Sequence, residues 1–139
     1  DNLRRFGPGY FDLIVVDAFS SDAIPVHLLT REAMALYLSR LAPGGAMLFH
    51  ISNRHMDLGP VVAATANEHG LLTWVRDARQ TPELTHERKV SPRVAIVARN
   101  AADLRFAEGE NWQLAEPAAV KPWRDDYADV LGAILRKPR

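Results

Sequence analysis

Residues 11–25, FDLIVVDAFSSDAIP, contain the stretch that decides the fold. Within it, Leu13–Val16 is an uninterrupted apolar run, which is typical of a parallel β-strand with both faces covered. The run ends at Asp17, a charged residue at the carboxyl end of a buried strand. The pattern predicts a strand at Phe11–Ala18 and a loop at Phe19–Pro25.

The next element outward is a helix. Thr30 is a suitable N-cap for a helix that runs to about Leu41 and is stopped by Pro43-Gly44-Gly45. We expect the buried face of this helix to contain Met34, Tyr37, Leu38 and Leu41, which recur at helical spacing. A second apolar run predicts a strand at Ala46–Ser52.

The rest of the chain continues the alternation. Pro60 suits the first position of a helix that Gly70 ends, and Leu71–Arg76 is a third strand. The polar segment Gln80–Ser91 predicts a mobile loop, and Arg93–Arg99 a fourth strand. Asp125 is suited to cap a last helix, whose apolar face we expect to hold Tyr127, Val130, Leu131, Ile134 and Leu135.

This order of elements defines an α/β fold class. Strands that alternate with helices favour a mostly parallel sheet with helices on its faces, and the first two strands should be adjacent. The third and fourth strands have no helix between them. They therefore predict a terminal antiparallel strand pair.

Composition limits the possible functions. The chain has 139 residues, of which 47% are hydrophobic, so one domain with a substantial core is expected. A formal net charge of zero argues against a nucleic-acid partner bound through a broad basic face. The chain has no cysteine, which excludes disulfides and thiolate sites. No apolar run approaches the roughly 18 residues that span a bilayer.

The segment Asp17–Thr30, DAFSSDAIPVHLLT, resembles the spermidine synthase-like family, especially bacterial members that can be fused to transporter segments. The stretches Leu41–Gly45, LAPGG, and Pro122–Tyr127, PWRDDY, are similar to the same family. The resemblance implies the C-terminal part of a Rossmann-like class I methyltransferase fold. It also implies a cytoplasmic location, or the cytoplasmic domain of a membrane-fused parent.

The resemblance also indicates what is missing. The family binds its S-adenosyl co-substrate mainly through its first three strands, including a glycine-rich turn, and this sequence has no G-x-G-x-x-G motif. We expect the chain to begin between the third and fourth strands of the fold. Alone, it should then be inactive and bind S-adenosylmethionine or decarboxylated S-adenosylmethionine weakly or not at all.

Two aspartates are the first candidate site residues. The resemblance implies that Asp17 is catalytic, because a carboxylate at a strand end can orient an amine and accept its proton. It also implies that Asp17, Ala18 and Phe19 contact the S-adenosyl group. Asp22 would hold a second ammonium of the substrate. The family spaces its two aspartates three apart rather than five, so the geometry for a diamine is in question.

Further candidates for binding the substrate come from two regions. His27, His50 and Asn53 lie near strand ends, where a histidine can equally be structural. The second region supplies Asp125, Asp126 and Tyr127. They would either cover the substrate pocket or act as a helix cap with an anchoring aromatic residue. The remaining histidines are too scattered to predict a metal site.

The resemblance implies aminopropyl transfer from decarboxylated S-adenosylmethionine to a small-molecule amine. Two alternatives stay open, because fold does not decide function. One is methyl transfer from S-adenosylmethionine to a small substrate, and the other is a non-catalytic domain attached to a transporter. The apolar strand at residues 11–18 should also find a partner strand outside its own chain, for example in a homodimer.

Overall fold

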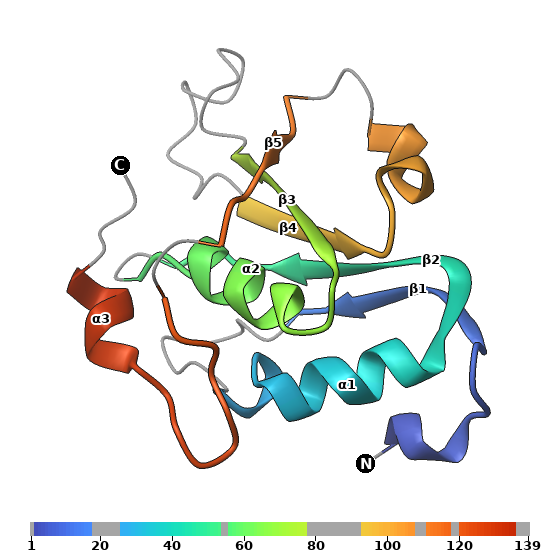
Figure 1. The fold of residues 1–139 in the computed structure, drawn as a ribbon, viewed down its shortest axis with the longest axis horizontal. Coiled ribbons are helices and arrows are strands. Elements are labelled where there is room, and N and C mark those ends of the chain that lie inside the picture. The colour runs from blue at the N-terminus through green and yellow to red at the C-terminus, as the bar shows by residue number, and fades with distance from the viewer. Residues whose placement is uncertain are drawn as a thin grey trace.

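The computed structural model describes residues 2–17, 26–53, 56–77, 93–107, 111–117 and 120–135 (Figure 1). The side chains of residues 106 and 107 are outside this description. The elements in chain order are η1 (Asn2–Arg5), β1 (Phe11–Val16), η2 (Val26–Leu28), α1 (Arg31–Arg40), β2 (Leu41–His50), α2 (Gly59–Asn67), β3 (Leu72–Asp77), β4 (Arg93–Ala98), η5 (Ala101–Ala107), β5 (Gln113–Leu114) and α3 (Val130–Leu135).

The described strands form one sheet in the order β1-β2-β4-β3-β5. β1 and β2 are adjacent and parallel, as expected, with Val15 opposite Leu48. The pairs β2–β4, β3–β4 and β3–β5 are all antiparallel. The expectation of a mostly parallel sheet is therefore wrong, because three of the four pairings are antiparallel.

The position of β4 explains this correction. β3 and β4 do form the expected antiparallel pair, but β4 inserts between β2 and β3 instead of closing the sheet at its end. The α2 connection carries the chain past one strand position, and β4 fills the gap. Ala95–Ala98 are all buried as a result, because β4 has a neighbouring strand on each side and a packed layer on each face.

The two faces of the sheet have separate cores. Alternate residues of a strand point to opposite faces, so Ile14 and Phe49 join the larger cluster with α1 and α2, while Ile96 joins a smaller cluster with Leu104 of η5. The smaller cluster covers β2, β4 and β3 but stops before β1. Leu13 and Val15, on that face of β1, are 53% and 56% exposed.

Helix α1 begins as expected, with Thr30 as its N-cap accepting the Ala33 N–H at 3.2 Å. Met34 and Tyr37 are buried, whereas Leu38 is only partly buried. The helix ends at Arg40, before the Pro-Gly-Gly segment, which lies inside β2 instead.

The Pro43-Gly44-Gly45 segment makes a register shift between β1 and β2. Phe11 pairs with Leu41, but Leu13 pairs with Ala46, so β2 bulges between these two points. A Cβ added to Gly45 would lie 2.8 Å from the Asp12 carbonyl oxygen and 2.9 Å from Leu41 side-chain atoms. Only glycine lets the bulge approach β1 this closely.

The last helix differs from the expectation. α3 begins at Val130, and the carboxylate that accepts a hydrogen bond from its first turn belongs to Asp129, 2.8 Å from the Gly132 N–H. Asp125 does not cap it. The expected apolar face is also wrong, since Leu131 and Leu135 are 73% and 82% exposed and only Ala133 of this helix is buried.

We predict that Gly45→Ala lowers the free energy of unfolding by about 1–3 kcal/mol, the usual cost of overpacking. Gly44→Ala is the matched control, because its added Cβ meets only the Asp103 carboxylate, at 4.0 Å. Urea denaturation of both variants measures the difference. Equal stabilities would show that the bulge does not depend on the contact between Gly45 and Asp12.

Candidate functional site

A groove of about 840 Å³ lies between β1, α1 and the short helices η1 and η2. Its apolar wall comes from β1 and α1 and includes Ile14, Val16 and Leu36. Its polar part lies near the carboxyl end of β1 and includes Asp17, His27, Glu32 and Asp125. Three of these four polar residues are candidates from the sequence, and the fold brings them to one groove.

Asp17 follows directly on β1 and has a side chain that is 67% exposed. The parallel register places Val16 of β1 opposite Phe49 of β2, so the residues that follow them, Asp17 and His50, come side by side. The Asp17 carboxylate lies 2.9 Å from His50 Nδ1. His50 does not line the groove itself, and it contacts the groove through Asp17.

Ser52 is a polar partner that our sequence reasoning missed. Its hydroxyl lies 2.8 Å from His50 Nε2 and accepts a hydrogen bond from the Arg93 N–H at 2.7 Å. The signal that could have found it is spacing. His50 and Ser52 are two residues apart at the end of a strand, so their side chains point the same way.

Asp125 comes to the groove from far along the chain. Its carboxylate accepts a hydrogen bond from the Thr30 hydroxyl at 2.7 Å, and its backbone N–H donates to the Glu32 carboxylate at 3.1 Å. Trp123 is fully buried, and its carbonyl accepts the Arg31 N–H at 2.8 Å. The PWRDDY stretch therefore contains an anchoring aromatic residue, and its hydrogen bonds hold the N-terminus of α1.

The remaining candidates lie elsewhere. The Asn53 side chain accepts the Met56 N–H at 3.0 Å, which closes a local turn. Asp126 and Tyr127 are exposed in a turn closed by hydrogen bonds between Arg124 and Tyr127, and neither lines the groove. Ala18, Phe19 and Asp22 lie outside the described residues.

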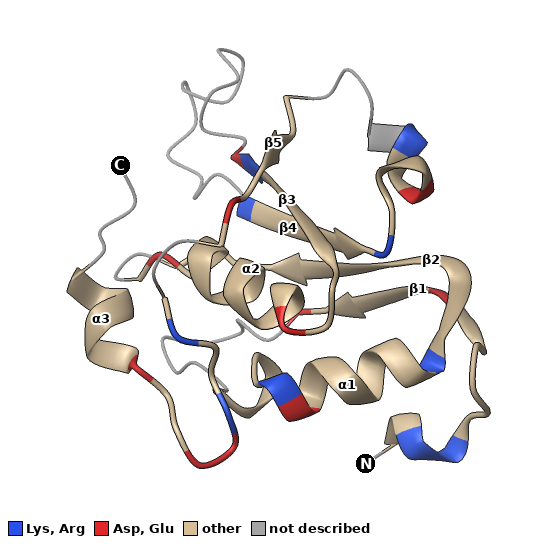
Figure 2. Ribbon diagram, in the orientation of Figure 1, with Lys and Arg blue, Asp and Glu red and all other residues tan. Residues whose placement is uncertain are grey.

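The charges of the groove favour a cationic ligand. Asp17, Glu32 and Asp125 contribute three carboxylates, while Arg4 of η1 lines the groove as a cation. Figure 2 shows the basic residues of η1 near one end of α1 and acidic residues in the turn before α3 near the other. An organic ammonium with an apolar chain would match carboxylates beside an aliphatic wall.

Tyr37 lines the groove from α1 and is 4% exposed. Its hydroxyl donates to the Leu28 carbonyl at 3.2 Å. Burial raises the pKa of Tyr37 from its ordinary value of 10.0 to about 12, because the phenolate would lose its hydration. The phenol stays neutral at physiological pH and holds η2 against α1.

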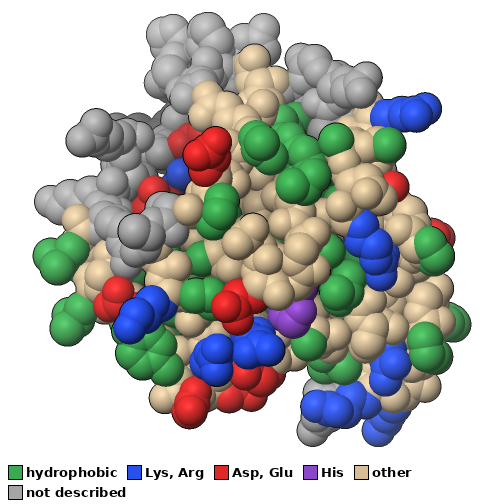
Figure 3. All heavy atoms as spheres, in the orientation of Figure 1, with side chains coloured by type: hydrophobic (Ala, Val, Ile, Leu, Met, Phe, Trp, Pro, Cys, Tyr) green, Lys and Arg blue, Asp and Glu red, His purple; other side chains and the backbone are tan. Residues whose placement is uncertain are grey.

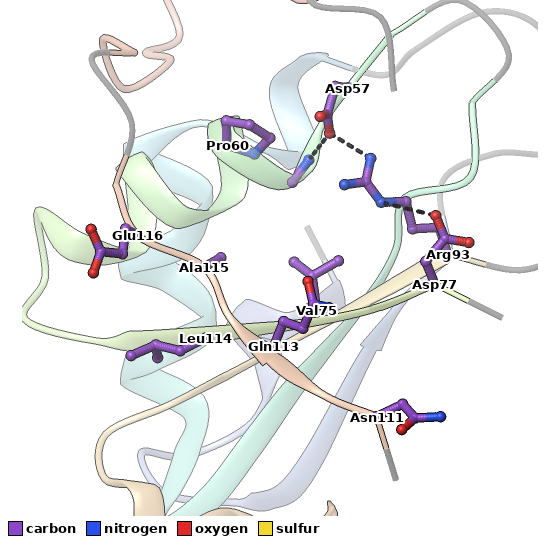
Figure 4. A pocket seen from close by; sticks show the side chains of 11 residues that line it. Asp57, Pro60, Val75, Asp77, Arg93, Asn111, Gln113, Leu114, Ala115 and Glu116 are labelled. Carbon is purple, nitrogen blue, oxygen red and sulfur yellow. Dashed lines mark hydrogen bonds and ion pairs between the residues drawn. The ribbon is translucent and has the colours of Figure 1, made fainter. Parts of the chain in front are cut away.

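A second cavity of about 310 Å³ lies between α2, β3 and β5 (Figure 4). The Arg93 guanidinium lies between its two half-buried carboxylates, 2.5 Å from Asp57 and 3.9 Å from Asp77. Asp57 also accepts the Gly59 N–H at the start of α2. The Asp57 and Asp77 side chains are only 18% and 17% exposed, whereas that of Asp17 in the groove beside β1 is 67% exposed.

Other kinds of site are not evident in the described part of the chain. No group of three or more His, Asp or Glu side chains there is placed to hold a metal ion. No helix among the same residues has the length and apolar character to cross a membrane. On the face shown in Figure 3, acidic and basic side chains are interspersed, so that face has no broad basic surface.

Comparisons with known proteins give a match for the fold and none for the sequence. No protein-family model matches the sequence, and no curated protein matches it. The crystal structure of a probable spermidine synthase from Corynebacterium glutamicum ATCC 13032 superposes with a TM-score of 0.60 at 18% identity. The match covers 93% of this chain and 52% of that one.

The chain thus has an α/β fold with a five-stranded mixed sheet that resembles the fold of a probable spermidine synthase. It spans about half the length of the protein that it matches. At this identity, the likeness is evidence for the fold alone.

We predict that Tyr37→Phe reduces the alkaline loss of stability. A Tyr pKa raised from 10.0 to about 12 in the folded state means that unfolding releases a proton between these values. The stability due to the neutral phenol is therefore complete below pH 10 and is lost as pH rises through 12. Between pH 9 and 12, the wild type should lose on the order of 1–2 kcal/mol more than Tyr37→Phe.

Denaturant unfolding of both proteins across this range makes the measurement. The comparison cancels the titration of lysines and of the other tyrosines, which both proteins share. Parallel stability curves for the two proteins would contradict the buried, neutral state of Tyr37.

Proposed function

We propose that this chain is part of a transferase that moves an aminopropyl group from decarboxylated S-adenosylmethionine to a small-molecule amine. The observation that carries the proposal is the Asp17 carboxylate at the carboxyl end of β1, within a groove that has two further carboxylates and an aliphatic wall. Ligands of open α/β sheets bind at this edge. The structural likeness to a probable spermidine synthase supports the same assignment.

The reaction needs a base near the amine. The amine nitrogen forms a bond to the propyl carbon, the bond from this carbon to sulfur breaks, and the electron pair leaves with sulfur as a neutral thioether. The new ammonium then releases one proton. Asp17 is exposed enough to meet the amine and can accept this proton. Asp125 and Glu32 would attract the substrate's other positive charge.

The S-adenosyl donor would be a co-substrate. Its sulfonium is a cation, so the carboxylates of the groove suit its charge, and we propose that Asp17, Ala18 and Phe19 contact it. No metal is needed in this scheme. The glycine-rich turn that the family uses is not in this sequence, so we propose that the remaining contacts come from residues outside this chain. We place the reaction in the cytoplasm.

We also propose that a second copy of this chain covers the edge of β1. No described strand lies beside β1 on the side away from β2, so its backbone donors and acceptors there are open to pairing. Leu13 and Val15 on this strand, and Tyr10 just before it, are each more than half exposed. An antiparallel β1–β1 contact would be two-fold symmetric and would bury these side chains.

We predict that Asp17→Asn in the full-length protein lowers the rate of spermidine formation from putrescine about 100-fold or more, the scale for a positioned base. Asp22→Asn should mainly raise the KM for the amine. Asp12→Asn, on the same strand at its opposite end, is the control and should remain active. Full activity of Asp17→Asn would contradict the proposed role of this carboxylate as the base.

The product identifies the reaction class. A methylated amine formed from S-adenosylmethionine would replace aminopropyl transfer with methyl transfer. If the wild type forms neither product and binds neither donor, a non-catalytic role is favoured.

We predict that this chain is a dimer in sedimentation velocity experiments and that Val15→Lys makes it monomeric, because a buried lysine in the β1 contact would be costly. Leu131→Lys, which changes an even more exposed apolar residue on α3, should leave the dimer intact. A monomeric wild type would contradict the proposal that a second copy covers the edge of β1. A full-length protein that is monomeric but whose β1 amides are protected from hydrogen exchange would also contradict it, because another segment of the same chain would then cover this edge.

A further inference from the structure

Four polar groups form a continuous line behind the candidate base. The Asp17 carboxylate is 2.9 Å from His50 Nδ1, and His50 Nε2 is 2.8 Å from the Ser52 hydroxyl. The Ser52 oxygen accepts the Arg93 N–H at 2.7 Å and lies 3.4 Å from the Arg93 carbonyl. The line runs from the groove, across the end of β2, to the start of β4.

The hydrogen-bond partners of Ser52 allow His50 to exist in two protonation states. When the imidazole is neutral with its proton on Nε2, this N–H donates to the Ser52 oxygen, the Ser52 hydroxyl donates to the Arg93 carbonyl, and Nδ1 can accept a proton from the Asp17 carboxyl group. When the imidazole is charged, Nδ1–H donates to the Asp17 carboxylate, and the contacts of Nε2 are unchanged. The Arg93 N–H keeps the Ser52 oxygen as its acceptor in both states.

We propose that His50 and Ser52 form a proton relay behind Asp17, an inference that rests on the proposed function. Asp17 takes the proton that the alkylated amine releases. Asp17 then passes this proton to His50 Nδ1, and the Ser52 oxygen accepts a hydrogen bond from Nε2–H of the charged ring. One proton enters from the amine, and the same proton leaves to solvent before the next turnover.

Ser52 has the position of the nucleophile in a carboxylate, imidazole and hydroxyl triad, but its surroundings favour a positioning role. A nucleophilic hydroxyl must be open to a carbonyl carbon and needs hydrogen-bond donors for the oxyanion. The Ser52 oxygen is instead held in the sheet between the N–H and the carbonyl of the same β4 residue. It is oriented toward His50 and not toward the groove.

From β1, His50 faces the Asp17 carboxylate, and Ser52 links it to the backbone of Arg93 in β4, whose guanidinium is directed to Asp57. The further titratable and charged groups on the groove side are Arg4, His27, Glu32, Tyr37 and Asp125.

The kinetic test uses the full-length protein with putrescine and decarboxylated S-adenosylmethionine. His50→Gln and Ser52→Ala should lower kcat about 10-fold to 100-fold, the scale for hydrogen-bonded partners behind a functional group, and leave the KM for the amine unchanged. Ser52→Thr keeps the hydroxyl and should restore most of the rate. His69→Gln is the control, because His69 bonds only a backbone carbonyl of α1 in the described contacts.

The pH profile separates a relay from a structural role. The fall of kcat on the acidic side, where a charged His50 can take no further proton, should disappear in His50→Gln and persist in His69→Gln. An unchanged acidic limb in His50→Gln would overturn the relay. Ser52→Thr with the same loss as Ser52→Ala would overturn the role of the hydroxyl.

Two further measurements keep this proposal distinct from the proposed function. Nitrogen NMR of the imidazole needs no substrate, and it should show the neutral His50 with its proton on Nε2. A neutral ring with its proton on Nδ1 could not accept a proton from Asp17 and would overturn the relay, even in an active enzyme. Hydrolysis of a p-nitrophenyl ester that depends on Ser52 would also overturn it, because Ser52 would then be a nucleophile. A wild type that transfers no alkyl group defeats the proposed function, and the NMR result still decides the state of His50.

Discussion

The parallel pairing of β1 with β2 is the constraint on which the rest of the structure depends. It aligns the carboxyl ends of two buried strands and so brings Asp17 beside His50, although 33 positions separate them in the sequence. The same pairing needs Gly45, because β2 bulges against the β1 backbone before the regular register begins. A change in this register would move the carboxylate away from its imidazole partner, as every side chain in a strand shifts together.

A second constraint holds the groove from the opposite side. The PWRDDY stretch, residues 122–127, packs against the N-terminus of α1. There Trp123 is buried, and Asp125 accepts a hydrogen bond from the Thr30 hydroxyl. Thr30 is at once the N-cap of α1 and the partner of Asp125. The start of this helix and the acidic part of the groove therefore share one hydrogen-bond network, and a substitution in either should alter the geometry of the other.

The two cavities differ in how exposed their paired carboxylates are. Around Arg93, the guanidinium forms ion pairs with two largely buried carboxylates, an arrangement typical of structural ion pairs. Beside β1, Asp17 is largely exposed, and its partner His50 is charged only when it is protonated. Carboxylates that the protein leaves near solvent in an apolar groove are the ones that can bind a cation. This contrast supports the groove, and not the second cavity, as the place to look for an amine.

The sequence by itself determined the local structure that depends on neighbouring residues. The apolar run at Leu13–Val16 predicts β1, the Thr30 cap predicts the start of α1, and the position of Asp17 at the end of the first strand marks it as a site candidate. Periodicity and capping are short-range effects, so the sequence displays them. Asp22 lies outside the described residues, and its role stays a prediction.

Only the tertiary structure decided what depends on contacts between distant segments. The insertion of β4 between β2 and β3 made the sheet mostly antiparallel. Strand order in a sheet depends on how the apolar faces are buried in the folded structure, and not on the order of the strands along the chain. Asp125 is hydrogen-bonded to Thr30 and does not cap α3, and the Asp129 carboxylate accepts a hydrogen bond from the first turn of that helix instead. Ser52 gained its place behind His50 from the Arg93 backbone, 41 positions away. No spacing in the sequence contains these pairings, since each forms only when the whole core closes.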